Sequence, residues 1–173
     1  MRLYPHATSK PLAYLGVQPC VNRETAGSIA GFLATVPMTI AMNAMHRALP
    51  EKDQHPLPPR HIAENAAAAA GVDLGASEDT HEAATLAAHF GYGAAAGSIY
   101  APFAGSTGLP RAAEGALYGV GVWGASYLGL LPGAGLYPAA TEESPARNGL
   151  MISAHLIWGA SLGLLMGLLE PKA

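Results

Sequence analysis

Charged residues along this 173-residue chain fall into clusters that leave four long stretches without Asp, Glu, Lys or Arg. A helix needs about 20 apolar residues to cross a bilayer, so each stretch is long enough to cross once. The pattern therefore predicts an all-α fold, an integral membrane four-helix bundle. The predicted spans are 26–47, 82–104, 112–131 and 149–169.

The polar residues are concentrated in two regions outside the predicted spans. The first is an N-terminal tail, residues 1–24, which is expected to be irregular or to lie at the membrane interface. The rest, residues 25–170, is predicted to form one four-span transmembrane domain. The second polar region is the loop 50–80, in which a Pro-Pro pair precedes an alanine-rich run that ends at Gly71. Proline at the start and glycine just past the end favour a short helix outside the membrane.

Composition excludes several classes of protein. Charged residues make up 12% of the chain, about half the share usual in soluble domains. No basic stripe is present, so nucleic-acid binding has no support. The single cysteine, Cys20, excludes an internal disulfide and any metal site built from cysteines alone. Residues 1–24 contain no apolar core of signal-peptide length, so the tail is expected to be retained.

Small residues recur at a spacing of four in every predicted span. One such pair would arise by chance in a chain with 21 glycines, but a pair in each span indicates a tightly packed bundle. Helices in lipid associate through close backbone contact, which this spacing permits. The predicted helix-packing residues include Gly93, Gly97, Gly115, Gly119, Gly159 and Gly163, with Gly27 and Gly31 in the first span.

A ten-residue pattern, Ala-His-x-x-aromatic-Gly-Ala-x-x-Gly, occurs twice, at 88–97 and 154–163. It places His89 and His155 at corresponding positions of the second and fourth spans. Positions four and seven residues after each histidine share its helix face, and these positions carry glycine and other packing residues. Both imidazoles are therefore expected to point at neighbouring helices, at similar depth, and not at lipid.

Three interpretations of the histidine pair remain open. Each imidazole could make an interhelical hydrogen bond that fixes packing. Both could be axial ligands of a b-type haem, with His89 and His155 as the cofactor-binding residues. A proton or metal-ion relay is the third interpretation. Glu114 is not expected to join them, because it opens an antiparallel span and lies near the opposite membrane face. No metal site is predicted.

Several segments resemble the YagU-like family of uncharacterised bacterial inner-membrane proteins. The likeness rests on Gly115–Pro132, on Arg147–Gly163, on the Leu-Pro-Pro-Arg sequence that ends at Arg60, and on the 88–97 run. The resemblance covers roughly residues 27–169. It implies a four-span protein of the bacterial plasma membrane and supplies no catalytic or cofactor residues.

The leading functional hypothesis is a non-enzymatic structural, assembly or accessory component of the bacterial inner membrane. The alternatives are a redox subunit that binds haem b through His89 and His155, and a small channel or carrier. The expected partners are the lipid bilayer and other membrane proteins or a second copy of the chain, and no nucleic acid. Lys and Arg are slightly more numerous on the side of the N-terminus, which favours a cytoplasmic N-terminus.

Overall fold

A computed structural model describes residues 22–170, and all regular structure within that range is helical. The predicted tail, apart from residues 22–24, lies outside this range, as does Cys20. The main helices are α1 (Arg23–Arg47), α2 (Pro58–Ala69), α3 (Glu78–Tyr100), α4 (Arg111–Ala125), α5 (Leu131–Gly133) and α6 (Pro145–Leu169). The short elements are η1 (Glu51–Asp53), η2 (Ala101–Phe103), η4 (Ala140–Glu142) and the π-helix η3 (Ser126–Leu130).

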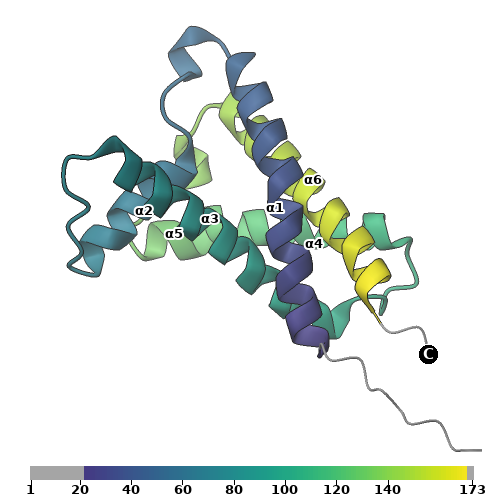
Figure 1. The fold of residues 1–173 in the computed structure, drawn as a ribbon. Helices are drawn as coiled ribbons and strands as arrows, with labels where there is room; N and C mark the ends of the chain where they lie inside the picture. The colour runs from purple at the N-terminus through teal and green to yellow at the C-terminus, as the bar shows by residue number, and fades with distance from the viewer. Residues whose placement is uncertain (1–21, 171–173) are drawn as a thin grey trace, which may run out of the picture.

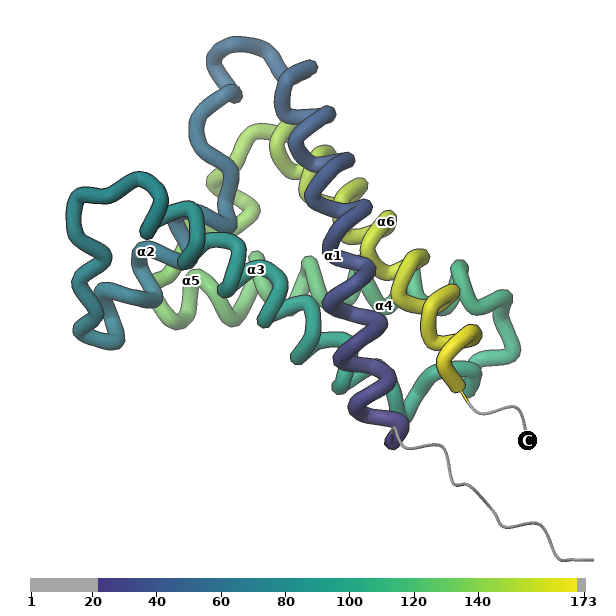
Figure 2. Tube along the Cα trace, viewed as in Figure 1, coloured from purple at the N-terminus to yellow at the C-terminus, as the bar shows by residue number. Residues whose placement is uncertain are grey.

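Two antiparallel helices, α1 and α6, lie side by side at the centre of the bundle (Figure 1). Helix α3 packs against α1, and α4 packs against α6. Helix α2 packs against α3. The trace from α4 through η3 to α5 crosses α1 and α6 at a steep angle (Figure 2). The prediction of an all-α bundle is therefore confirmed.

The four predicted spans correspond to α1, α3, α4 and α6, but only two of these helices, α1 and α6, are both long and apolar enough to cross a bilayer. Helix α3 begins at Glu78, four residues before the predicted span, and its first turn carries acidic residues. Helix α4 has 15 residues before the π-helix begins. A stretch without charges can still be rich in Ala and Gly, which contribute little apolar surface.

Glycines bring the helices of each outer pair into backbone contact. A Cβ on Gly31 would overlap the carbonyl oxygen of Gly93, and one on Gly97 would overlap that of Gly27. The same arrangement joins the other pair, whose four glycines also face one another, Gly115 and Gly119 of α4 against Gly159 and Gly163 of α6. The bundle thus consists of two glycine-packed pairs, α1–α3 and α4–α6, joined through α1 and α6.

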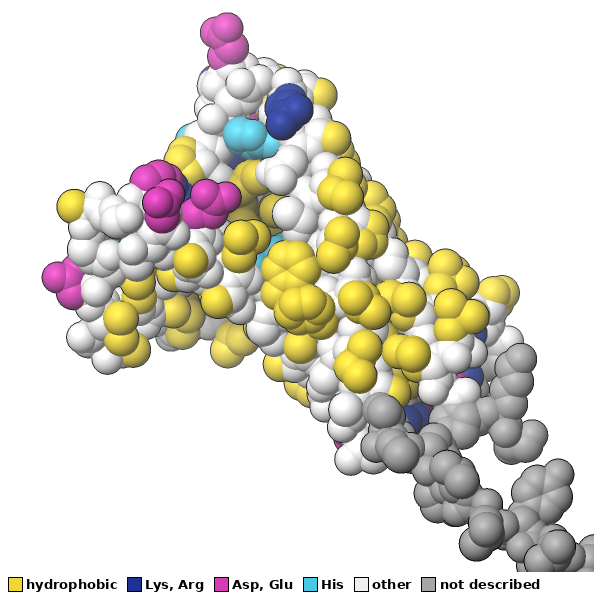
Figure 3. Space-filling model, in the orientation of Figure 1, with side chains coloured by type: hydrophobic (Ala, Val, Ile, Leu, Met, Phe, Trp, Pro, Cys, Tyr) yellow, Lys and Arg dark blue, Asp and Glu magenta, His cyan; other side chains and the backbone are white. Residues whose placement is uncertain are grey.

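Small side chains lie at the closest helix contacts, larger ones such as Tyr100, Trp158 and Leu162 fill the rest of the interior, and many other large apolar side chains face outward. Ala30, Ala34 and Ala154 are fully buried between helices. Phe32 and Ile40 of α1, in contrast, are 47% and 66% exposed. Apolar side chains form a band over this face of the molecule, and acidic ones gather to its left, over α2 and the start of α3 (Figure 3).

Local sequence explains where the helices begin. The Asn22 side chain accepts a hydrogen bond from the Thr25 amide at 2.7 Å and caps α1. Ser144 accepts one from the Arg147 amide at 3.2 Å and caps α6, with proline at its first position. Helix α2 also begins with proline, and Gly71 follows it with φ of +71°.

Candidate functional site

The two histidines of the repeated pattern, on α3 and α6, line one cavity of about 240 Å³. Five parts of the chain surround this space, namely α1, α2, α3, the η3–α5 segment and α6. Both imidazoles also border a second, much smaller cavity of about 20 Å³ next to Trp158. Helical spacing in the sequence predicted that both rings point between helices, and the structure brings the two rings to a common space. We call the larger space the imidazole cavity; its other lining residues are Met38, Pro59, Ile62, Ala88, Tyr92, Ser126, Tyr127, Leu130, Leu131, Leu136 and Met151.

His155 is buried and is held by its own helix. Its Nδ1 lies 2.8 Å from the Met151 carbonyl oxygen, which can only accept, so Nδ1 carries the proton and donates. This bond fixes the tautomer of the neutral ring and leaves Nε2 without a proton. The Tyr127 ring stands edge-on to the imidazole, with the ring centroids 5.9 Å apart.

His89 has a different environment. Its Nε2 is buried and has no hydrogen-bond partner in the described part of the chain. Phe90 stands edge-on to the ring, with the centroids 6.0 Å apart. Within residues 22–170, therefore, neither imidazole forms the interhelical hydrogen bond that the packing interpretation expects.

Sequence reasoning missed the hydroxyl groups of the imidazole cavity. The Tyr92 and Ser126 hydroxyls are joined by a hydrogen bond of 2.7 Å between α3 and η3. Ser126 begins the π-helix, where an extra residue per turn redirects the side chains. Nothing in the sequence marks that π-helix. The contribution of Pro59 and Ile62, from a loop that was expected to lie outside the membrane, was not foreseen either.

The imidazole cavity is too small for haem in the observed arrangement of the helices. The free Nε2 of His155 and the unpartnered Nε2 of His89 suit axial ligation. The cavity, however, has about 240 Å³, below the roughly 300–1,000 Å³ of sites that hold drug-sized ligands. A porphyrin would require the helices to separate.

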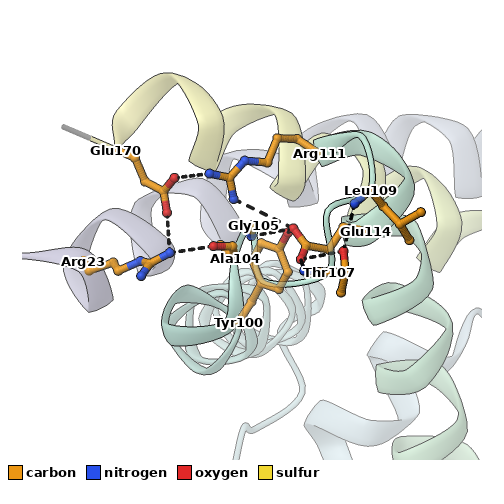
Figure 4. A network of polar contacts seen from close by, with 9 residues as sticks. All are labelled: Arg23, Tyr100, Ala104, Gly105, Thr107, Leu109, Arg111, Glu114 and Glu170. Carbon is orange, nitrogen blue, oxygen red and sulfur yellow. Dashed lines mark hydrogen bonds and ion pairs between the residues drawn. The ribbon is translucent and has the colours of Figure 1, made fainter. Parts of the chain in front are cut away.

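Glu114 is a buried carboxylate near the start of α4, and it organises the turn between α3 and α4 (Figure 4). It accepts hydrogen bonds from the Tyr100 hydroxyl at 3.0 Å and the Gly105 amide at 2.6 Å. The amide and hydroxyl of Thr107 donate to it at 3.2 and 3.0 Å. Arg111 forms an ion pair with it at 3.8 Å. Among the described residues, no group of three His, Cys, Asp or Glu side chains is placed to hold a metal ion.

A shared carboxylate, Glu170, ties three helix ends together beside this turn (Figure 4). It pairs with Arg23 at the start of α1, at 2.7 Å, and with Arg111 at the start of α4. Arg23 also donates to the Ala104 carbonyl at 2.6 Å. The beginning of α1, the end of α3, the beginning of α4 and the end of α6 therefore meet at one end of the bundle.

Arg147 organises the opposite end, where α6 begins. It is 3% exposed and pairs with Glu143 at 2.9 Å. Its guanidinium donates to the carbonyl oxygens of Asp53 and His55 at 3.0 and 3.1 Å. Further acceptors are Pro56 and the Tyr137 hydroxyl. The segment after α1 is thus fixed to the start of α6.

Ion pairs join α2 to the start of α3 on the surface. Arg60 pairs with Glu64 at 2.9 Å and with Glu78. His81 faces the Gly75 carbonyl at 3.1 Å and the Glu64 carboxylate at 2.8 Å, two acceptors that require both ring nitrogens to donate. These hydrogen bonds raise the pKa of His81 above its ordinary value. The hydrogen bond from His81 is the main cause that lowers the pKa of Glu64.

Compared with known proteins, the chain matches no family model, no curated protein and no solved structure. The resemblance to YagU-like proteins therefore stays a hypothesis, and the function must be argued from the geometry alone.

Proposed function

We propose that the protein is a non-enzymatic structural or accessory component of the bacterial inner membrane that crosses the bilayer four times. The spans are α1, the part of α3 that follows Glu82, α4 with its π-helical continuation, and α6. The observation that carries the proposal is the combination of glycines at the closest helix contacts with many large apolar side chains exposed on the outside of the bundle, among them Ile40, Ile99 and Leu164. This is the arrangement expected of helices that associate in lipid, where burying large apolar groups brings no gain.

The length and ends of the central helices support this proposal. Helices α1 and α6 have 25 residues each, which corresponds to about 37 Å at 1.5 Å per residue. This exceeds the roughly 30 Å of a bilayer core. The charged side chains of both helices lie at their ends, at Arg23, Glu24 and Arg47 of α1 and at Arg147 of α6.

The connections support four crossings in place of two. The loop after α3 is bound to Arg23 and so lies at the end of the bundle where α1 begins. The segment after α1 is bound to Arg147 and lies at the other end. Helix α3 therefore returns the chain from one end to the other, and α4 takes it back, although α3 is less apolar than α1 and α6 and α4 alone, with 15 residues, is too short to cross a bilayer.

An accessory role is supported by the use of the buried polar groups. Glu114 and Arg147 bond to loops and helix ends and so hold the bundle together. We place the N-terminal end of α1 on the cytoplasmic side, following the distribution of Lys and Arg. Partners would be lipid and other membrane proteins or a second copy.

Cysteine labelling in intact cells tests the crossings. Single cysteines would replace exposed Lys52, Ser106 and Thr141 in a Cys20→Ser background, followed by treatment with a membrane-impermeant maleimide. Four crossings place Lys52 and Thr141 on one side and Ser106 on the other. If only α1 and α6 cross, all three positions react from the same side and the proposal is wrong. Permeabilised cells, in which every position should react, provide the control.

A further inference from the structure

We infer that the imidazole cavity is a binding site for a small, uncharged, lipid-soluble molecule that carries a hydrogen-bonding oxygen. The inference goes beyond the role proposed above and does not depend on the number of crossings. It rests on the unpartnered His89 nitrogen, on the charge-free lining and on the irregular helix that forms one wall.

The first step is the state of His89. Its Nε2 is shielded from solvent and has no partner among residues 22–170, whereas nearly all buried polar atoms of proteins have one. The Tyr92 and Ser126 hydroxyls that line the same cavity are hydrogen-bonded to each other, and neither bonds to this nitrogen. A ligand oxygen is the partner that this nitrogen lacks.

The second step is the charge of the ligand. No Asp, Glu, Lys or Arg lines the imidazole cavity, and most of its wall is Leu, Met, Ile and aromatic ring. An ionic ligand would lose its hydration there and gain no counter-charge, which is strongly unfavourable. A neutral molecule with one polar group fits this wall.

The third step is a route of entry. A neighbouring cavity of about 290 Å³ shares His89 and Pro59 with the imidazole cavity. It is lined by polar groups, among them Arg60, Glu78 and Glu82. His89 thus lies between a polar opening and an apolar interior, which places the ligand oxygen near His89 and its apolar part deeper.

The fourth step is the wall that widens the space. The π-helix η3 contributes Ser126, Tyr127 and Leu130 to the cavity. Such single π turns interrupt α-helices at a cost and occur frequently at functional sites. Helix α2 closes the other side through Pro59 and Ile62, so the site combines the bundle with the extramembrane helix.

A matched set of naphthalenes tests this inference on the purified full-length chain in detergent. The three probes are β-naphthol, which has one hydroxyl, naphthalene, which has none, and β-naphthoate, which is anionic. Fluorescence anisotropy of each probe is measured against protein concentration. We expect saturable binding of β-naphthol, about tenfold weaker binding of naphthalene, and weaker binding still of β-naphthoate.

Variants distinguish binding at the imidazole cavity from nonspecific partitioning of the probe into the detergent micelle. His89→Leu should weaken β-naphthol to the affinity of naphthalene, whereas His61→Leu, at an exposed position of α2, should have no effect. Ala88→Phe fills the cavity from an exposed position of α3 and should abolish saturable binding, even if His89→Leu fails to fold. Equal binding to the wild type and Ala88→Phe, equal affinity for β-naphthol and β-naphthoate, or a haem absorption band in the purified protein would each overturn the inference.

Discussion

Replacement of Gly115 by alanine tests the packing of α4 on α6. A Cβ at this position would overlap the carbonyl oxygen of Gly159 in the facing backbone, which no side-chain rotation can relieve. Ordinary contact requires the two helices to move apart by roughly 1 Å, and a gap of that size forfeits a quarter to a half of each dispersion contact. Overpacking of this kind costs about 1–3 kcal/mol.

The control is a second glycine on the same helix, Gly121, which faces away from α6. Gly121 has no atom within 4 Å of where a Cβ would stand. Gly121→Ala should therefore show only the gain in helix propensity, at most about 1 kcal/mol. Gly115→Ala has the same propensity gain, so the difference between the two variants isolates the cost of helix contact.

Thermal unfolding in detergent, followed by circular dichroism, gives the measurement. We expect Gly115→Ala to unfold at a lower temperature than the wild type and Gly121→Ala at the same or a higher temperature. The double variant Gly115→Ala/Gly159→Ala should lose less than the sum of the single losses, because helices already separated accommodate the second methyl group more easily. Equal stability of Gly115→Ala and Gly121→Ala would refute the contact between α4 and α6.

Two further predictions concern the polar clusters. For His81, whose pKa is raised, the stabilising contribution is fully present below the ordinary histidine pKa and is lost as the pH rises through the raised value. The melting temperature of His81→Gln should therefore fall below that of wild type at about pH 5 and match it at about pH 9; a gap that widens with pH would contradict the assignment. Arg147→Met leaves several carbonyl oxygens without donors and should cost about 3 kcal/mol and expose the 50–57 segment to proteolysis. The exposed Arg47→Met is its control, and similar melting temperatures for both variants would show that the buried contacts contribute little.

Periodicity in the sequence predicted the helices and the faces on which their small residues lie. Glycine spacing marks where backbones can approach, and the structure places Gly93 against Gly31 and Gly119 against His155 of α6. Each histidine precedes a packing glycine by four residues, so it shares the helix face of that glycine and its ring points between helices. These features depend only on the spacing of residues within one helix, so they can be predicted from the sequence.

The features that sequence could not provide depend on long-range geometry. The π-helix at Ser126 has no sequence signature, yet it forms one wall of the imidazole cavity. Closure of the cavity by Ile62 depends on how α2 folds back on α3. The absence of charge in 82–104 and 112–131 suggested apolar spans, but α3 is rich in Ala and Gly and α4 ends after 15 residues at the π-helix, so neither is both long and apolar enough to cross a bilayer as a regular helix.

The carboxylate that joins Arg23 and Arg111 has a consequence for biosynthesis. Glu170 lies 147 residues from Arg23, so this contact forms only after the last helix has been made. The contacts between α1 and α3, and between α4 and α6, need only neighbouring segments of the chain. The α1–α3 pair can therefore assemble while the later helices are still being made, whereas the α4–α6 pair must wait for α6. The ion pairs of Glu170 form only when both pairs have docked through α1 and α6.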